Sequence, residues 1–183
     1  MESKFQLQLK YLAYFLGAFI VIEIINLLSG RALNQFSILP RDPSSLIFIL
    51  TAPFLHANLH HFFSNIFTLS IFAFLLFQFG NKQFLKVTAI LILSTGILVW
   101  LLGRNAYHLG ASGLLYGYFG YLVLAGWMQK RLSLMLISIV IAFMYGGIIF
   151  GVLPSRPYIS WESHLFGFIS GLGLAWLMRS KQR

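Results

Sequence analysis

The chain contains no cysteine and few charged residues. Among its 183 residues, 9% are charged and four are acidic, whereas about a quarter of a soluble domain is charged. The lack of cysteine excludes disulfides and thiolate chemistry. The only aspartate is Asp42, and no His-Glu-x-x-His motif occurs. These absences exclude a site built from two buried aspartates and the zinc-binding helix common in metalloproteases.

Hydrophobic residues, by contrast, make up 58% of the chain, and the mean hydropathy is +0.82. They form long runs instead of alternating with polar residues, which is typical of integral membrane proteins. The first run is too long for the core of a secretory signal. Six runs, each close to the ~20 residues that a bilayer requires, predict an all-α polytopic bundle in one domain, residues 1–183, with six transmembrane helices at about 11–29, 59–79, 84–103, 112–129, 132–150 and 161–178.

Basic residues predict the orientation of these spans, because cytoplasmic segments of membrane proteins carry an excess of lysine and arginine. With both termini in the cytoplasm, nine basic residues lie inside and four lie outside. The net charge of +9 therefore reflects topology and indicates no nucleic-acid partner. A multi-pass protein of the bacterial plasma membrane fits this pattern, as would one of an organelle inner membrane. The four outer residues are Arg31, Arg41, Arg104 and Arg156.

A serine and a histidine lie where two of these spans begin. Ser112 lies in a Gly-Ala-Ser-Gly segment, residues 110–113, and His164 lies near the start of the sixth span. An ionisable group inside a membrane is costly and indicates a functional site, and a hydroxyl nucleophile needs a base. From the helical rise, Ser112 lies about 5 Å below the outer surface of the hydrocarbon core. His164 and Asn65 lie at a similar depth, and His61 lies one turn higher.

Small residues indicate that the fourth and sixth spans contact each other, because helices in lipid approach closely where glycines line the contact. His164, Gly167 and Gly171 lie on one helical face. Close packing would bring Ser112 within hydrogen-bond reach of His164, and Tyr116, one turn after Ser112, would orient the imidazole. The fourth span contributes glycines of its own: Gly113, Gly117 and Gly120.

An acyl-transfer site also needs hydrogen-bond donors for the oxyanion. Asn65 and His61 lie four residues apart on one face of the second span. Unpaired backbone N–H groups at the start of the fourth span, near Ser112, would add further donors. Each residue has another interpretation. Asn65 could form a hydrogen bond between helices, His61 could extend to the membrane interface, and Ser112 could serve as a helix N-cap.

Three motifs, on spans two, four and six, resemble those of the rhomboid family of intramembrane serine proteases: His61-x-x-x-Asn65, Gly110-x-Ser112-Gly113 and His164-x-x-Gly167. The resemblance covers about residues 10–178 and implies a six-helix bundle whose loop 103–111 dips into the membrane to deliver the serine. It implies Ser112 as nucleophile and His164 as base, without a third acid and with Tyr116 stacked on His164. It also implies an oxyanion hole formed by the Asn65 and His61 side chains and the Ser112 N–H.

The chain departs from the family pattern in two places. Many members carry a Trp-Arg pair in the first outer loop, where this chain has Ile47-Phe48. Ser163 precedes the histidine where alanine or glycine is common. The first outer segment, residues 30–58, is unusually apolar for a loop, and we expect it to lie in the membrane interface.

Two glutamates need a separate explanation. Glu162 lies two residues before His164, so on a helix it points to another face. There it would complement the helix dipole, with Ser160 as the N-cap. Glu23 lies inside the first span near Asn26 and needs a partner or a water path. We expect a structural hydrogen bond for Glu23.

The resemblance implies an endopeptidase that cleaves transmembrane segments of membrane-protein substrates within the lipid bilayer and uses no cofactor or metal. The fifth span and loop 151–160 would form the side entrance, and Gly146, Gly147 and Gly151 would let that region move. Three alternatives remain: an inactive relative that binds client membrane proteins, a small transporter or channel, and a metal site at His56, His60 and His61. The sequence specifies neither the oligomeric state nor the substrate.

Overall fold

Six α-helices make up most of the chain. The computed structural model of the protein describes residues 3–154 and 159–179. Within these residues no strand forms, and the β-type pairing is one isolated bridge between Ile38 and His108. The predicted all-α fold is confirmed. The helices are α1 (Lys4–Leu28), α2 (Leu59–Leu76), α3 (Asn81–Leu102), α4 (Ser112–Gln129), α5 (Leu132–Tyr145) and α6 (Trp161–Met178).

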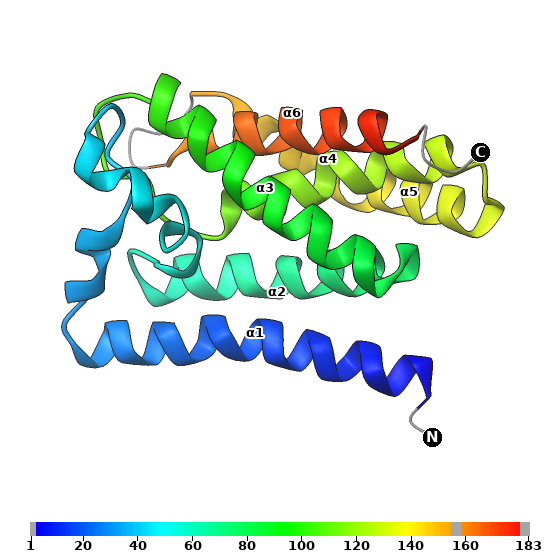
Figure 1. Ribbon diagram of the computed structural model, residues 1–183, viewed down its shortest axis with the longest axis horizontal. Helices are drawn as coiled ribbons and strands as arrows, with labels where there is room; N and C mark the ends of the chain where they lie inside the picture. The colour runs from blue at the N-terminus through cyan, green and yellow to red at the C-terminus, as the bar shows by residue number, and fades with distance from the viewer. Residues whose placement is uncertain (1–2, 155–158, 180–183) are drawn as a thin grey trace.

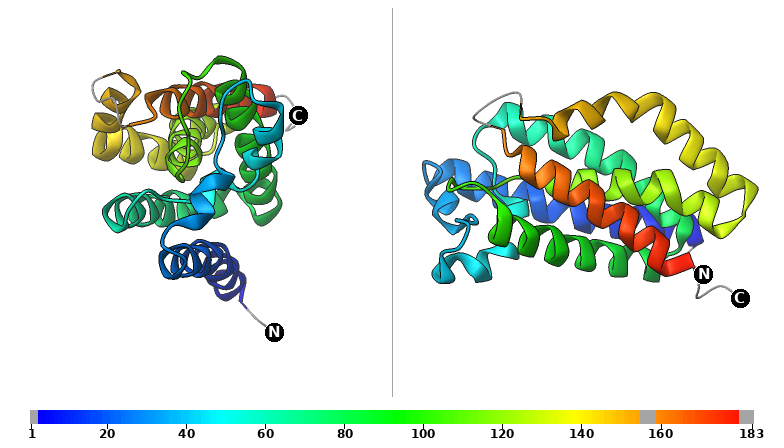
Figure 2. Two further views of the ribbon diagram at one scale, coloured as in Figure 1. Left: turned by 90° about the vertical axis from the view of Figure 1, so that its left-hand side faces the viewer. Right: turned by 90° about the horizontal axis from the view of Figure 1, so that it is seen from above.

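Helix α4 occupies the centre of the bundle. It is buried along most of its length and contacts α2, α3, α5 and α6. Helix α1 lies at the edge and packs mainly on α2 (Figure 1 and the left view of Figure 2). Helices α2, α4 and α6 all begin toward the end of the bundle that lies opposite the two termini (Figure 1). The starts of these three helices can therefore contribute to one site.

Local sequence explains where the helices begin and end. Helix α1 starts well before the predicted span at residue 11, because Ser3 and Gln6 form a capping box. Helices α4 and α6 have the predicted bounds, 112–129 and 161–178. Helix α5 ends before the predicted residue 150. The chain continues as a 3₁₀ helix, η5 (Gly146–Val152), because glycine is a poor α-helix former.

Three short 3₁₀ helices form the segment between α1 and α2: η1 (Ala32–Phe36), η2 (Pro43–Ile49) and η3 (Ala52–Phe54). A proline at the start of η2 and another within η3 explain why no long α-helix forms here. Ile49 packs so closely on Gly96 of α3 that any larger residue at position 96 would collide with it. The segment therefore lies against the C-terminal half of α3.

This segment is anchored although it lacks the Trp-Arg pair. Trp100 Nε1, near the end of α3, donates to the Asp42 carbonyl at 2.9 Å, and Arg41 Nη1 donates to the Gly103 carbonyl at 2.7 Å. Ile47, by contrast, is 64% exposed. Trp100 of α3 and Arg41 of the segment itself thus hold the segment between α1 and α2 to the end of α3.

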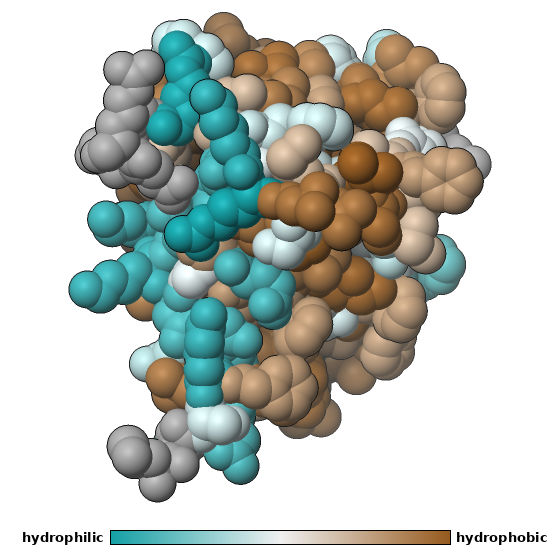
Figure 3. Space-filling view, turned by 90° about the vertical axis from the view of Figure 1, so that its right-hand side faces the viewer, coloured by the Kyte–Doolittle hydropathy of each residue, from teal (hydrophilic) through white to brown (hydrophobic). Residues whose placement is uncertain are grey.

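The helices form a polytopic bundle of the kind that spans membranes. Among the described residues, four stretches are long and apolar enough to cross a bilayer: α1, α2 with the 3₁₀ helix η4 (Phe77–Phe79), α3, and α5 with η5. Helices α4 and α6 are not among these four stretches. Both contain several glycines, α4 also contains three tyrosines, and α6 contains a histidine and two serines, which lowers their hydropathy. Neighbouring helices cover α4. The six-span count therefore remains a prediction. The end of the bundle that bears the termini shows hydrophilic residues gathered beside a hydrophobic surface (Figure 3).

Candidate active site

Helices α4 and α6 approach until their backbones touch. A Cβ atom on Gly167 would collide with the carbonyl of Gly113, and one on Gly171 would collide with the carbonyl of Gly117. Gly120 faces the Phe168 carbonyl in the same way. Such close contact is what glycine faces provide between helices in lipid. It places the starts of α4 and α6 side by side.

A cavity of about 560 Å3 opens where these helices begin. Ser112 from α4, His164 from α6, and His61 and Asn65 from α2 all line it. Loop 103–111 supplies another part of the wall. The four side chains that sequence analysis selected for nucleophile, base and oxyanion binding therefore share one cavity.

The imidazole of His164 is held from two sides. The ring of Tyr116 stacks on it, with centroids 4.1 Å apart and an interplanar angle of 4°. His164 Nδ1 lies 2.8 Å from the Gly151 carbonyl, and because a carbonyl only accepts, Nδ1 must carry the proton. The Tyr116 hydroxyl donates to the Ile148 carbonyl at 2.7 Å. The ring is thereby fixed with Nε2 unprotonated, which is the form that a general base requires.

Ser112 is the first residue of α4. Ala111 occupies the N-cap position, and the Ser112 side chain makes no capping hydrogen bond, so the N-cap interpretation of this serine is wrong. Within residues 3–154 and 159–179, no hydrogen bond joins Ser112 to the His164 ring. Catalytic hydrogen bonds are often long in the absence of substrate. The hydroxyl of Ser112 therefore remains available to the cavity.

Asn65 and His61 face the backbone that precedes Ser112. A Cβ atom on Gly110 would lie 2.7 Å from His61 Cε1 and 3.6 Å from Asn65 Nδ2. Gly110 has a φ of +115°, which disfavours any other residue there. Asn65 Nδ2 is buried and has no hydrogen-bond partner among the described residues, so its amide does not join two helices. A buried donor without a partner costs free energy and is explained if a ligand accepts from it.

A protein-family model described as the Rhomboid domain matches residues 43–181. The chain belongs to the rhomboid family. Uncharacterized proteins of Mycobacterium bovis and Mycobacterium tuberculosis are each 33% identical to it over 178 residues, which cover 92% of this chain and 74% of theirs. An uncharacterized protein of Mycobacterium leprae is 32% identical over 178 residues, with 92% of this chain and 70% of that protein covered.

In this rhomboid domain, His56 holds the backbone next to the serine. The Ala111 N–H donates to His56 Nε2 at 3.3 Å, and the Gly110 N–H donates to the Ala52 carbonyl at 2.9 Å. Burial lowers the pKa of His56 to about 3, so the ring stays neutral and keeps its acceptor. From the sequence, His56 had no predicted catalytic role and was named only in the alternative metal site. The available signal was that His56 directly follows an apolar stretch, Pro53-Phe54-Leu55.

Among the described residues, neither Glu23 nor Glu162 forms a hydrogen bond with the His164 ring. Glu162 is 2% exposed and pairs with Arg104, with 3.4 Å between its Oε1 and Arg104 Nε. Glu23 pairs with Arg31 at 2.6 Å, which gives it the structural role that was expected. No cluster of three histidines, cysteines or acids within the described part of the chain has the geometry to hold a metal, so the histidine metal site has no support.

Proposed function

We propose that the chain is an intramembrane serine endopeptidase that cleaves transmembrane segments of other membrane proteins. The observation that carries the proposal is the hydrogen bond from His164 Nδ1 to the Gly151 carbonyl. It leaves Nε2 free to accept a proton, and His164 lines the same cavity as Ser112. A buried hydroxyl and a base of the correct tautomer in one cavity match the needs of nucleophilic acyl transfer.

In the proposed reaction, His164 Nε2 takes the proton of the Ser112 hydroxyl as Oγ attacks the scissile carbonyl carbon. The resulting tetrahedral oxyanion breaks down when the C–N bond cleaves and the imidazolium donates its proton to the leaving amine. Water then attacks the acyl-enzyme, with His164 again as base, and releases the acid and the free serine. The sequence of proton transfers follows the general logic of serine hydrolases and requires no metal.

The oxyanion would be bound by Asn65 Nδ2, by the His61 ring and by the backbone N–H of Ser112. Asn65 Nδ2 is the strongest of these candidates, because it is buried with no hydrogen-bond partner in residues 3–154 and 159–179 and Asn65 lines the cavity. A donor that is already desolvated and oriented loses little on binding the oxyanion, which is the source of its catalytic effect.

The proposed substrates are transmembrane helices with a locally unstable segment, because a stable helix keeps its carbonyls in hydrogen bonds. In the proposed topology, six spans with cytoplasmic termini in a bacterial plasma membrane, the cavity opens to the outer side. Water then reaches Ser112 without crossing the hydrocarbon core. Substrates would enter beside α5 and the segment that follows it, as the likeness to the family implies.

The direct test is cleavage of a transmembrane reporter in liposomes by the wild type and by Ser112→Ala and His164→Ala. Ser70→Ala is the matched control, because Ser70 lies on α2, is outside the cavity and, within the described part of the chain, bonds only to the Phe67 carbonyl. We expect both site variants to lose cleavage and the control to retain it. A fluorophosphonate should label the wild type and not Ser112→Ala.

Two outcomes would contradict the proposal. Cleavage that survives Ser112→Ala would reject the mechanism. A wild type that captures the reporter without cleaving or reacting with the fluorophosphonate would favour the alternative of a non-catalytic protein that binds client membrane proteins.

A further inference from the structure

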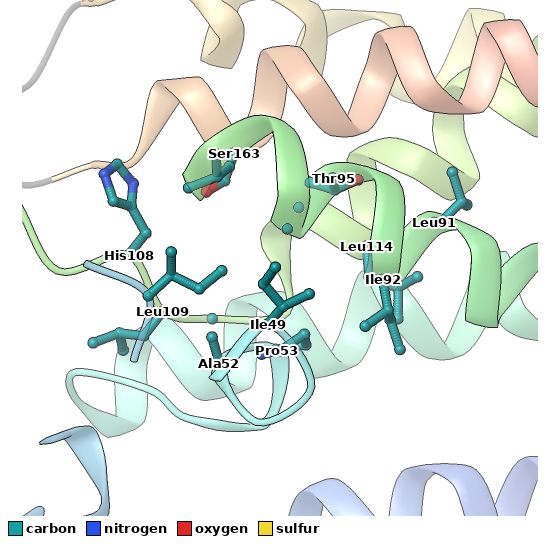
Figure 4. Close-up of a pocket in the computed structure, with 15 residues that line it drawn as sticks. Ile49, Ala52, Pro53, Leu91, Ile92, Thr95, His108, Leu109, Leu114 and Ser163 are labelled. Atoms are coloured by element: carbon teal, nitrogen blue, oxygen red, sulfur yellow. The ribbon is translucent and has the colours of Figure 1, made fainter. Parts of the chain in front are cut away.

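Loop 103–111, which leads to Ser112, lies between two cavities. The large cavity that Ser112 and His164 share borders one side of it. On the other side a small cavity of about 30 Å3 lies between this loop, η2, η3 and α3 (Figure 4). Leu109 lines both cavities. Open space therefore borders part of the loop, and polar contacts to α6 add to the packing that holds it in position.

The first polar contact joins Arg104 to the start of α6. Arg104 Nε lies 3.4 Å from Glu162 Oε1, and the Arg104 backbone N–H donates to the same oxygen at 3.4 Å. Arg104 Nη2 donates to the Ile159 carbonyl at 2.6 Å. The carboxylate of Glu162 is almost fully buried, and a buried charge is tolerated only when it is paired. The ion pair therefore ties the beginning of the loop to α6.

A chain of hydrogen bonds makes the second contact. His108 Nε2 lies 3.1 Å from the Arg104 carbonyl, so Nε2 carries the proton and Nδ1 accepts. Ser160 Oγ lies 2.6 Å from His108 Nδ1 and must donate to it. Ser160 Oγ in turn accepts from the backbone N–H and the hydroxyl of Ser163. Burial lowers the pKa of His108 below its ordinary value, which favours the neutral ring that this arrangement needs.

On the basis of the proposed function, we infer that Glu162 is a positioning residue. Through Arg104, and alongside the His108–Ser160 bond, it fastens the loop that carries Ser112 to the helix start that carries His164. Glu162 lies outside the lining of the large cavity and directly precedes Ser163 and His164 in the chain. Its carboxylate therefore acts on the alignment of the nucleophile and the base and does not contact the substrate.

The test is Glu162→Gln, which keeps the size of the side chain and removes its charge. We expect kcat for the transmembrane reporter to fall about tenfold, because small misplacements of reacting groups are costly, while KM stays within about twofold. Labelling by a fluorophosphonate should slow by the same factor, because this small probe needs the aligned serine and histidine but no helix-binding surface. Arg104 is 35% exposed, so water can solvate it and the variant should fold.

A double substitution tests whether Glu162 acts through Arg104. Arg104→Gln alone leaves a buried carboxylate unpaired, and it should reduce kcat and stability more than Glu162→Gln does. The pair Arg104→Gln with Glu162→Gln should behave like Glu162→Gln alone, because the interaction is already lost. Asp42→Asn makes the same acid-to-amide change outside the site and should match the wild type in kcat and labelling rate.

Each result decides the inference. A slower labelling rate with folded protein and an unchanged KM supports it. Equal labelling of wild type and Glu162→Gln overturns it, as does a loss of kcat that only tracks the amount of unfolded protein. A wild type that neither cleaves nor is labelled rejects the proposed function itself, whereas an active wild type with an unaffected Glu162→Gln rejects this inference alone.

Discussion

Helices α5 and α6 both pack against α4, but they do so in different ways. Helix α6 follows α4 with glycine against backbone at Gly113, Gly117 and Gly120, so the two helices are in contact over several turns. Helix α5 makes its tight contact at Gly126, near the end of α4, where the backbone and side chain of α5 meet it. Toward the opposite end of α5 the contacts are between side chains: Ile141 is fully buried, and the Tyr145 ring packs on Phe72 of α2 with centroids 5.0 Å apart. One wall of the site, the fixed wall formed by α6, therefore contacts the α4 backbone closely along its length, and the other, the loose wall formed by α5 and η5, does so mainly at one end.

The 3₁₀ helix η5, which belongs to the loose wall, nevertheless contacts the site. The carbonyls of Gly151 and Ile148 in η5 bind His164 Nδ1 and the Tyr116 hydroxyl. Gly146 and Gly147 have open space around them, whereas Gly151 packs against Tyr116 and His164. Two of the three glycines expected to allow movement thus have no neighbour around a Cβ, and the third is part of the site. The expected movement stays a prediction. Movement of η5 would change the environment of the proposed base.

Disrupting the contact between α4 and α6, the fixed wall, should have the largest effect on stability and activity. In Gly171→Val the new side chain would collide with the Gly117 carbonyl and lie against the Tyr121 N–H, which are backbone groups that cannot yield. We expect a loss of about 3 kcal/mol of stability, measured by unfolding in mixed micelles, together with loss of reporter cleavage. Gly173→Val is the matched control, because no atom lies within 4 Å of a Cβ there. Equal damage from both substitutions would show that the α4–α6 contact is not special.

Disturbing the contact of η5, in the loose wall, with Tyr116 and His164 should have the next largest effect. In Gly151→Ala the methyl group would collide with the Tyr116 hydroxyl and lie 3.3 Å from His164 Nδ1. We expect kcat to fall about ten- to a hundredfold while the protein stays folded, since a displaced base loses its alignment. Gly147→Ala, which meets nothing within 4 Å, should change kcat little. If the two variants have the same kcat, η5 does not position His164.

The sequence predicted the fixed wall better than the loose one. The bounds of α4 and α6 follow from polar residues at their starts and basic residues after their ends, and their glycine faces indicate the contact. Hydropathy alone placed the end of the fifth span at residue 150, because an apolar 3₁₀ turn and an apolar α-helix have the same mean hydropathy. The 3₁₀ helix is distinguished from a continued α-helix by the backbone conformation from Gly146 onward, which hydropathy does not report.

The tethers of loop 103–111 could not be predicted, because they join residues far apart in the chain. Arg104 and Glu162 are separated by 58 positions, and neither residue lies in a sequence motif that indicates its partner. His61, Asn65 and His164 could be selected because an ionisable or amide group inside a membrane is rare, and Ser112 could be selected from its Gly-Ala-Ser-Gly segment at the start of a span. The orientation of the His164 ring depends on the backbone carbonyl of Gly151, and no side-chain pattern encodes it.

Acid should weaken the backbone support next to Ser112 and leave the α5 contact unchanged. The pKa of His56 is lowered from 6.5 to about 3 by burial, so the unfolded chain binds a proton that the folded chain does not. Stability from this residue is present above pH 6.5 and is lost as the pH falls toward 3. We expect a loss of about 2 kcal/mol between pH 7 and pH 5. In His56→Asn the pH dependence of unfolding should be smaller by that amount, and an unchanged dependence would contradict this assignment.

Weakening the anchor of α5 should have the smallest effect. Ser138 is buried, its hydroxyl donates to the Leu122 carbonyl at 2.5 Å, and it accepts from the Gly126 N–H at 3.2 Å. Ser138→Ala should lower stability by about 1 kcal/mol, the typical net value of a hydrogen bond, and fluorophosphonate labelling should stay within about twofold of wild type. Ser133→Ala, at an exposed position of the same helix, is the control for stability. A tenfold slower labelling of Ser138→Ala would mean that the reactive serine and histidine depend on α5 as much as on α6, and the distinction between a fixed and a loose wall would then fail.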